Sequence, residues 1–464
     1  MPTGLHRIYR RRDILFSGLA AALAPPQPSP PIRTRMFWTW DHSTEWVLNR
    51  PGAQTMGALN PYTRHPETFV EDYTRLLRWC GRHGVDAVVV WGLLRDSHGG
   101  IEAARRLCDV ARQQGVRLLC GVGLNAYGGV FYEGDSPYSL ERHLERHPEL
   151  CAVDESGNKV VHVSGRRREH NACPSLAGNQ DFAVESLRWL FQTLPLGGVQ
   201  VETGDTGVCR CKRCETRRRH PVSRFSWEDM ALMYPLAASA IRSVAPDAWI
   251  VCETYSHPEP HPEPEKPPNF GDGKPPWADE CLREFPRLVF VQWVCDKFVK
   301  PKSSMLWTRA GTVSAEGGRR HVMRAHFGTY WGGGYRGELA IDWLAEMVQR
   351  SIDHGFDAIS IIGEVSPQQA GAELNYLALA NYGSTSNPRA ELEVFLRDVA
   401  SPLLGGLGRA RDFLRYARLS QDPKQIPAAL RAIHALCGRL ALEPAQRWVW
   451  LANYLGSFLE SQPG

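Results

Sequence analysis

Acidic side chains recur in this sequence at or just after the ends of short apolar runs. Where such runs are strands of one parallel barrel, their carboxyl ends meet at one mouth and the closing residues point into it. Cleavage of a glycosidic bond needs two carboxyl groups there, one to protonate the leaving oxygen and one to act as nucleophile or base. Any single acid could instead belong to a structural ion pair, but the set predicts a site acting on glycosidic bonds. The set is Asp41, Glu202, Asp205, Glu253, Asp296 and Glu364.

Aromatic residues accompany these acids. The chain holds 15 tryptophans, and a flat apolar ring at a barrel rim can stack against a sugar. Bulky core packing is the other interpretation of the same residues. His326 alternates with apolar neighbours, so it could bond a substrate hydroxyl or lie satisfied in the core. Beside Asp41 and His326, the candidate substrate contacts are Trp38, Trp40, Trp91, Trp293, Tyr330 and Trp331.

A cysteine motif follows the acids at 202 and 205. Cys209, Cys211 and Cys214 have C-x-C-x-x-C spacing, which lets three thiols face one tetrahedral ion. Zinc requires a fourth ligand, and Cys173 is the best candidate. Four thiolates leave no position open for water, so such a zinc would be structural. Disulfides or free thiols are the alternatives for this set. Other cysteines of the 12 in the chain are expected in the core, namely Cys80, Cys108, Cys120 and Cys252.

Eight short β-rich runs could position these groups, and they alternate with amphipathic helical stretches. This alternation predicts an α/β protein, a (β/α)₈ TIM barrel with long βα loops. No Gly-x-Gly-x-x-Gly follows the first run, which removes the main support for a dinucleotide fold. The expected strands are Met36–Asp41, Ala87–Trp91, Arg117–Val122, Gly198–Glu202, Trp249–Glu253, Leu288–Trp293, His321–Phe327 and Ala358–Ile362. The expected helices include Pro66–His83, Ile101–Gln114, Asp181–Leu194, Trp227–Val244 and Leu339–His354.

Three parts of the chain are expected from these patterns. Residues 1–35 are an export signal and Pro-rich linker, residues 36–386 the catalytic barrel, and residues 387–464 a C-terminal helical segment. Long loops follow the third, fifth and sixth strands, on the side where barrel enzymes build active sites. Gly84, Gly115 and Gly355 stand where helices should stop before the next strand.

The first residues resemble a twin-arginine export signal. Arg10, Arg11 and Arg12 precede a short apolar run, 16–24, that is too brief to span a membrane, and a Pro-rich stretch follows. A disordered basic tail is the alternative. The segment carries +3 of the formal charge of +4, so nothing electrostatic favours nucleic acid as a partner. The sequence therefore predicts a periplasmic or secreted protein without stable membrane insertion.

One stretch of the chain is similar to a known family. His147-Pro148-Glu149, Val153-Asp154, Gly157, Arg167-Arg168, His170, Cys173-Pro174-Ser175 and the C-x-C-x-x-C motif recur in the order of the zinc-containing β-galactosidase family of barrel glycoside hydrolases. The resemblance covers about residues 145–215. It implies that Cys173, Cys209, Cys211 and Cys214 bind zinc, and that the general acid/base lies at the end of the fourth strand.

The chain departs from that family at two places. The family closes the fourth strand with Asn-Glu, whereas this chain has Glu202-Thr203-Gly204-Asp205, so either acid could be the acid/base. The family's nucleophile is a glutamate on the seventh strand, yet residues 321–334 contain no carboxylate, and Glu364 is the nearest substitute. The tail, with Tyr376-Leu377-Ala378 and a helix after Asn387-Pro388, resembles poorly characterised barrel hydrolase-like proteins.

The sequence thus predicts a glycoside hydrolase acting on an oligo- or polysaccharide outside the cytoplasm. Glu202 or Asp205 is the expected acid/base, and Glu364 or Glu253 its partner. The missing carboxylate on the seventh strand favours an alternative, a non-catalytic carbohydrate-binding barrel. A hydrolase with catalytic zinc is a third hypothesis, against which the four thiols argue.

Overall fold

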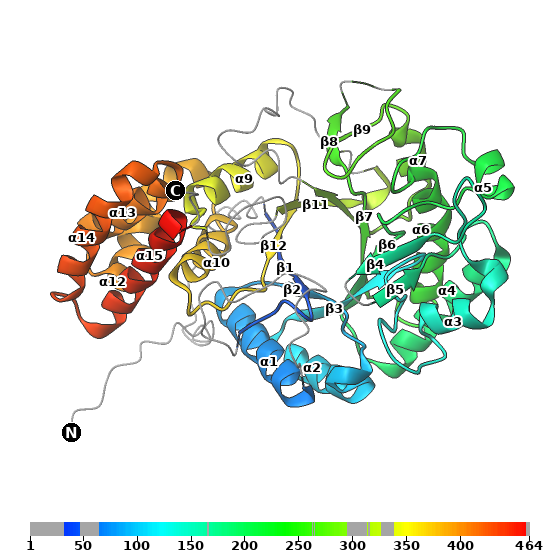
Figure 1. Cartoon of the computed structure of the whole chain (residues 1–464), viewed down its shortest axis with the longest axis horizontal. Helices are drawn as coiled ribbons and strands as arrows, with labels where there is room; N and C mark the ends of the chain where they lie inside the picture. Colours follow the sequence, from blue (N-terminus) through cyan, green and yellow to red (C-terminus); the bar gives the residue numbers. More distant parts are fainter. Residues whose placement is uncertain are drawn as a thin grey trace, which may run out of the picture.

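A closed barrel of eight parallel strands forms the body of the molecule (Figure 1). The computed structural model describes residues 32–46, 65–164, 167–261, 263, 265–294, 313, 316–325 and 338–460. Around the barrel the strand order is β1-β12-β11-β10-β7-β6-β3-β2, closing on β1. The bounds are β1 Thr34–Trp40, β2 Ala87–Trp91, β3 Arg117–Gly123, β6 Gly198–Glu202, β7 Trp249–Glu253, β10 Phe290–Val294, β11 Arg320–Ala325 and β12 Ala358–Ile362. All eight predicted strands are confirmed, with ends displaced by at most two residues.

The two faces of each strand meet different surroundings, as the alternation of side chains in a strand requires. On β2, Ala87, Val89 and Trp91 belong to a cluster inside the barrel. Val88 and Val90 belong to the larger core between the strands and the surrounding helices. The same alternation decides which polar residues enter the barrel, because each strand has one inward face.

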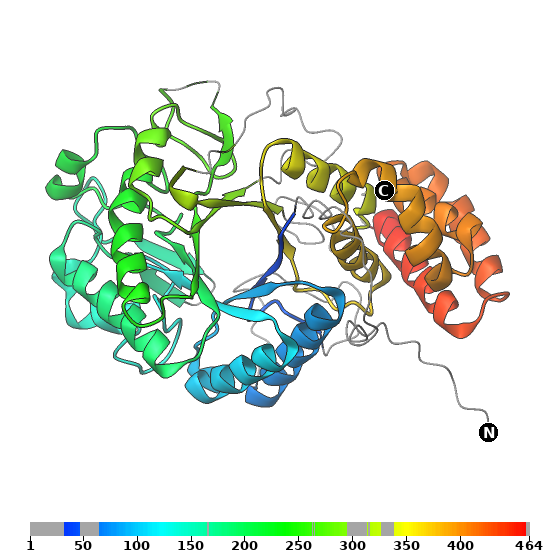
Figure 2. The same ribbon diagram turned by 180° about the vertical axis from the view of Figure 1, so that it is seen from behind.

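Helices cover the outside of the barrel (Figure 2). Glycines end two of them as predicted: Gly84 after α1 and Gly115 after α2 take the left-handed conformation, with φ of 69° and 68°. Gly355, with φ 79°, stands just after α9. The main helices are α1 Pro66–His83, α2 Gly100–Gln114, α4 Ala177–Thr193, α6 Trp227–Arg242, α9 Ile341–Asp353 and α10 Ala370–Tyr382.

Short elements occupy the long loops at the carboxyl end of the strands. The loop after β3 holds α3, Leu140–Arg146, and an antiparallel hairpin of β4, Val161–Ser164, and β5, Arg167–His170. The loop after β6 holds α5, Lys212–Arg217. The loop after β7 holds β8, His257–Pro260, β9, Gly273–Lys274, and α7, Ala278–Glu284. These insertions build the rim on the β3, β6 and β7 side.

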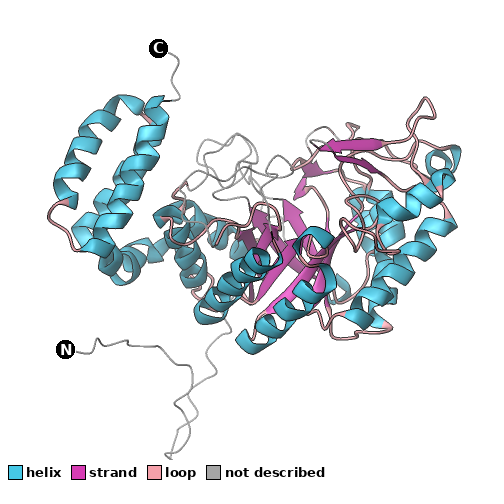
Figure 3. Cartoon of the chain, turned by 60° about the horizontal axis from the view of Figure 1, so that its bottom comes forward, coloured by secondary structure: helices cyan, strands magenta, loops and turns pink. Residues whose placement is uncertain are grey.

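A C-terminal helical region stands beside the barrel (Figures 1 and 3). It comprises α12 Ser401–Leu404, α13 Leu407–Ala417, α14 Ile426–Cys437 and α15 Leu442–Glu460, after short turns from Pro388 on. Arg447 of α15 makes a bidentate ion pair with Glu373 of α10, at 2.7 and 2.8 Å. In the described parts of the chain, no helix is long and apolar enough to cross a membrane. Of the predicted export signal and Pro-rich linker, 1–35, residues 1–31 lie outside the described residues.

Gly121 shows how tightly the interior is filled. It lies opposite Trp91 in the β2–β3 register, and a methyl group there would overlap the Trp91 ring. We expect Gly121→Ala to lower the free energy of unfolding by about 1–3 kcal/mol through overpacking. Gly408, in α13, has open space around its Cβ position, so Gly408→Ala should be neutral or slightly stabilising. Urea unfolding of both variants checks this. Equal stability of the two would contradict the tight packing of the interior.

Candidate functional site

Two glutamates close neighbouring strands at the carboxyl end of the barrel. Glu202 ends β6 and Glu253 ends β7, and these strands pair in parallel. Both side chains are buried, with exposed fractions of 5% and 0%. The chain thus places two acids together in an interior where charge is costly unless it is compensated.

Glu253 is compensated by four donors. Its Oε1 accepts hydrogen bonds from the backbone N–H groups of Thr254, at 3.0 Å, and Tyr255, at 2.9 Å. Its Oε2 accepts one from the Gln292 amide at 2.7 Å and makes an ion pair with Arg324 at 3.2 Å. Arg324 comes from β11, the seventh strand along the chain in the barrel, and is 3% exposed. This carboxylate is therefore fixed and has no exposed surface.

Glu202 has weaker compensation. Its Oε1 accepts a hydrogen bond from the Gln200 amide at 3.0 Å, and its Oε2 accepts one from the Tyr255 hydroxyl at 2.7 Å. Burial is the main cause that raises the pKa of Glu202 to about 8, and the charge of Glu253 adds to it. Arg324 and the Tyr255 hydroxyl act in the opposite direction. Glu202 therefore holds a proton near neutral pH, as a general acid must.

Asp205 lies three residues beyond Glu202 and is the more accessible acid. Its side chain is partly exposed. The Tyr127 hydroxyl, from the loop after β3, donates a hydrogen bond to Asp205 Oδ1. The Tyr127 ring meets Trp40 and Trp91 edge-on, with centroids 6.2 and 5.9 Å apart. This contact places an acid of the β6 loop beside the aromatic residues of β1 and β2.

The predicted aromatic residues divide into two groups. Trp38, Trp40 and Trp91 lie in the cluster inside the barrel, and the Trp40 ring is 5.9 Å from Trp38 and 5.4 Å from Trp91. The structure corrects the prediction that Trp293 is a substrate contact at the mouth. Its side chain lies on the outer face of β10, where it packs against Trp227 of α6 and donates a hydrogen bond to His321 at 3.0 Å. The alternation along β10 turns Gln292, not Trp293, towards the interior.

Two other predicted acids have strong local partners. Asp41 accepts hydrogen bonds from Arg95 at 2.8 Å and lies 2.9 Å from His42 and 3.2 Å from His98. Burial would raise the pKa of Asp41, but Arg95 and the two histidines hold it well below its ordinary value. Asp41 is therefore an ionised member of a buried ion-pair group.

Glu364 accepts hydrogen bonds from the Trp40 backbone N–H and the Ser43 hydroxyl, both at 2.8 Å. It follows β12, which stands four strands from β6 in either direction around the barrel. It therefore lies across the mouth from Glu202, whereas Glu253 is the neighbour. The remaining predicted site residues lie outside the described part of the chain; they are Asp296, His326, Tyr330 and Trp331.

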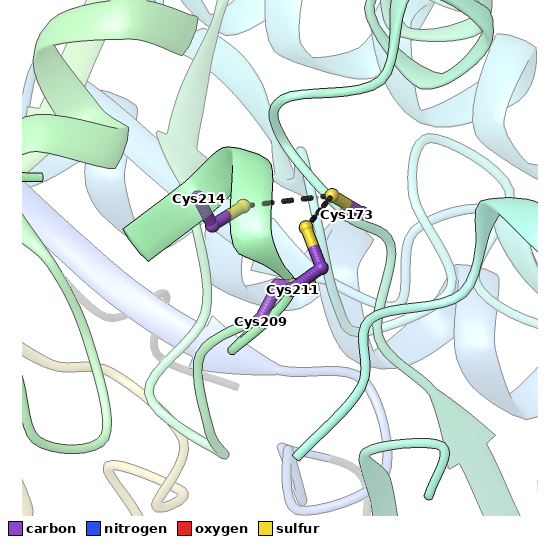
Figure 4. A group of neighbouring side chains, drawn as sticks. All are labelled: Cys173, Cys209, Cys211 and Cys214. Atoms are coloured by element: carbon purple, nitrogen blue, oxygen red, sulfur yellow. Dashed lines mark hydrogen bonds between the residues drawn. The ribbon is translucent and has the colours of Figure 1, made fainter. Parts of the chain in front are cut away.

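The four predicted cysteines come together (Figure 4). Their sulfur atoms all lie within 4.8 Å of one another, and Cys173 is 3.7 Å from Cys211 and 3.5 Å from Cys214. A tetrahedral zinc–thiolate centre requires sulfur separations of about 3.8 Å, because each Zn–S bond is ~2.3 Å long. Hydrogen bonds with Cys173 and Cys209 lower the pKa of Cys214, and this favours the thiolate, the form that binds metal. The cluster could therefore hold one metal ion.

Polar contacts connect this cluster to the loop that carries Asp205. Asn171, two residues before Cys173, donates hydrogen bonds to Thr206 at 3.1 Å and to the carbonyl of Gly207 at 2.9 Å. Arg218 donates to the carbonyl of Cys209 at 2.6 Å and pairs with Asp229 of α6. The cluster thus anchors the β6 loop on one side to the β3 loop and on the other to a barrel helix.

Sequence reasoning missed several residues of the site. Arg324 could have been predicted from the alternation of side chains along β11. Val322 points into the barrel, so Arg324, two residues later, points to the same face. Tyr127 and Tyr255 could not, because their positions depend on left-handed backbone conformations, with φ of 54° and 57°, that tyrosine rarely adopts.

Comparison with known proteins concerns the fold. A glycoside hydrolase of family 138 that targets pectin rhamnogalacturonan II superposes with a TM-score of 0.50 and 9% identity, over 93% of this chain and 57% of that one. An α-amylase from Lactobacillus plantarum has a TM-score of 0.46 and 11% identity, over 78% and 82%. A family 20 exo-β-N-acetylglucosaminidase from Vibrio harveyi has a TM-score of 0.43 and 11% identity, over 82% and 59%.

The chain has the barrel fold of glycoside hydrolases. At these identities the likeness concerns fold alone. The chain spans little more than half of the length of the family 138 enzyme. No family model matches the sequence, and no curated protein matches it.

The protonation of Glu202 can be tested without a substrate. Its carboxyl keeps a proton up to about pH 8 in the folded chain, whereas the unfolded chain ionises it near pH ~4.3. The contribution of the Glu202 proton to the free energy of unfolding is therefore complete below the pKa of the unfolded chain. It is lost as the pH rises to the pKa of the folded chain. Since glutamine does not titrate, we expect Glu202→Gln to gain stability relative to the native protein across this window.

Urea unfolding at a series of pH values measures that difference. Glu102→Gln, an exposed acid on α2, is the control and should show no such trend. A stability difference for Glu202→Gln that stays constant between these pH values would mean that Glu202 is ionised at neutral pH.

The cysteine cluster predicts how many metal ions each chain binds. We expect one metal ion per chain by elemental analysis, and Cys214→Ser should lose the metal together with about 2 kcal/mol or more of stability, because metal binding is coupled to folding of the loop. Cys437→Ser, on the partly exposed Cys437 of α14, should keep both. Metal-free protein containing two disulfides among the four cysteines would refute the metal site.

Proposed function

We propose that the chain is a glycoside hydrolase that acts on an oligo- or polysaccharide outside the cytoplasm. The observation that carries the proposal is the buried Glu202, with its pKa raised to about 8, at the mouth of a barrel that also holds accessible Asp205. Two carboxyl groups whose environments differ in this way are the requirement for acid and base roles at one site.

In this proposal Glu202 is the general acid. Its proton passes to the oxygen of the leaving sugar as the bond from that oxygen to the anomeric carbon breaks. Asp205 is the carboxylate that faces the anomeric carbon, either as nucleophile or as base for water. Glu253, with its four donors, acts on the charge of Glu202 rather than on the sugar. Glu364 is the alternative partner from across the mouth.

Trp38, Trp40 and Trp91 supply the apolar side of the proposed site, and Asp41 supports it through Arg95. The cysteine cluster fits zinc, since four thiolates suit a closed tetrahedral structural centre. The resemblance over residues 145–215 to zinc-containing β-galactosidases supports that choice of metal. The same proposal includes export through the basic N-terminal segment. It also includes the division of the chain into three parts, with boundaries after residues 35 and 386.

Activity and its pH dependence test the assignment. Release of sugars from a panel of plant, algal and host glycans identifies a substrate, and we expect kcat/KM to fall above about pH 8 as Glu202 ionises. Glu202→Gln should lower kcat by roughly 10²–10⁴-fold, and Asp205→Asn should also lower it strongly. Glu253→Gln removes a charge that raises the Glu202 pKa, so the alkaline limb should move to lower pH. Unchanged turnover in both Glu202→Gln and Asp205→Asn would refute the assignment.

One observation favours a second candidate, a non-catalytic carbohydrate-binding barrel. In the described residues of the seventh strand, 320–325, the inward polar side chains are Arg320 and Arg324, and Arg324 is paired with Glu253. A binder should retain glycans on an array without releasing sugar, and Glu202→Gln should leave its Kd unchanged. Sugar release by the native protein would exclude this candidate.

A further inference from the structure

Two tyrosines flank β6 in the same unusual way. Tyr127 follows β3 and Tyr255 follows β7, and β3 and β7 are the two strands that pair with β6. Both residues have a left-handed backbone, with φ of 54° and 57°. For a residue with a Cβ this conformation costs about 1–2 kcal/mol. Surrounding contacts must therefore hold it, and such residues concentrate at functional sites.

Tyr255 connects the two buried glutamates. Its hydroxyl donates to Glu202 Oε2 at 2.7 Å and accepts from the backbone N–H of Gly204 at 3.1 Å. Its own backbone N–H donates to Glu253 Oε1 at 2.9 Å. The left-handed φ at residue 255 sets the direction of its N–H relative to its side chain, and in this conformation one residue contacts both acids.

The ring of Tyr255 is rigidly placed. It is 2% exposed and packs against Phe225 and Phe270, with centroids 5.1 and 6.1 Å away. Burial and the nearby Glu202 raise the pKa of the phenol well above its ordinary value. The hydroxyl therefore remains protonated over the working range and is a permanent donor to the carboxyl group.

We propose that Tyr255 is a positioning residue that fixes the orientation of Glu202 relative to Glu253 and decides how readily Glu202 gives up its proton. A donor to the ionised form favours that form, so the phenol opposes the effects of burial and of Glu253. The other groups that act on Glu202 are Glu253 of β7, Arg324 of β11 and Asp205 of its own loop. The phenols of Tyr127 and Tyr234 are also close enough to respond to its charge. The inference adds to the proposed function, but the titration of Glu202 can be measured whether or not the chain is an enzyme.

The test compares two buried tyrosines. Tyr255→Phe removes the donor to Glu202. Tyr234→Phe removes a hydroxyl that donates at 2.6 Å to the backbone carbonyl of Glu253 and touches no carboxylate. The measured quantity is the titration midpoint of Glu202, obtained from the pH dependence of the unfolding free energy of each protein relative to the same protein carrying Glu202→Gln. We expect Tyr255→Phe to raise the midpoint by roughly half to one pH unit and Tyr234→Phe to leave it unchanged.

Two results would overturn the inference: an unchanged midpoint in Tyr255→Phe, or the same shift in Tyr234→Phe. Site-specific replacement of Tyr255 by a ring-fluorinated tyrosine keeps the shape and strengthens the donor, so it should lower the midpoint. This second variant decides the matter if the phenylalanine variant does not fold.

Catalysis provides an independent arm. If the proposed function holds, the alkaline limb of kcat/KM should move up in Tyr255→Phe and down in Glu253→Gln, with the same directions as the titration midpoints. A shifted midpoint in a protein that releases no sugar would keep the role of Tyr255 and reject the proposed function. An active protein in which Tyr255→Phe does not shift the midpoint would keep the proposed function and reject the role of Tyr255.

Discussion

Two carboxyl groups and one guanidinium share the interior of the barrel at its carboxyl end. Glu253 has the guanidinium of Arg324 within 3.2 Å and three further donors. Among the described residues, the donors to Glu202 are two neutral groups. Burying a second negative charge beside the first is costly, and uptake of a proton is the less costly solution. The asymmetry of the donors therefore decides which glutamate carries it. That decision turns two similar residues into groups with different chemistry.

The barrel makes this asymmetry possible through simple alternation. β7 lies between β6 and β10, so Glu253 has inward-pointing neighbours on both sides. Gln200 and Glu202 come from β6, and Gln292 comes from β10. Gln200 and Gln292 each give an amide proton to a different glutamate. The positive charge comes from β11, at the strand where the β-galactosidase resemblance implied a nucleophilic glutamate. In this chain the described charged side chain that points inward at the end of β11 is Arg324, and it compensates Glu253 of β7.

The sequence predicted the parts of the structure that follow from periodicity. Alternation within each strand, with glycine stops such as Gly84 before the next strand, located all eight strands and the main helices, since these patterns are local. The cysteine spacing predicted the four-thiol cluster because ligand geometry restricts which residues can share an ion. That Glu202 and Glu253 are neighbours follows from the predicted barrel, in which the fourth and fifth strands are adjacent. The donors that make the two acids different depend in part on Tyr255, whose left-handed backbone is not encoded in a local pattern. The position of Trp293 was not predicted because composition says nothing about which face of a strand a tryptophan occupies. The alternation along β10 places Phe290 and Gln292 inward and Trp293 outward.

The cysteine cluster bears on the chemistry through the loops it joins. Cys173 belongs to the β3 loop and the other three thiols to the β6 loop. The same two loops meet again where Asn171 bonds Thr206, and a third time where Tyr127 donates to Asp205. These three connections between the same two loops restrict the β6 loop, and with it Asp205. A metal held by four thiolates has no free position for water or substrate. A metal held there would therefore act on the acids mechanically, by fixing the contact between the β3 loop and the β6 loop that carries Asp205.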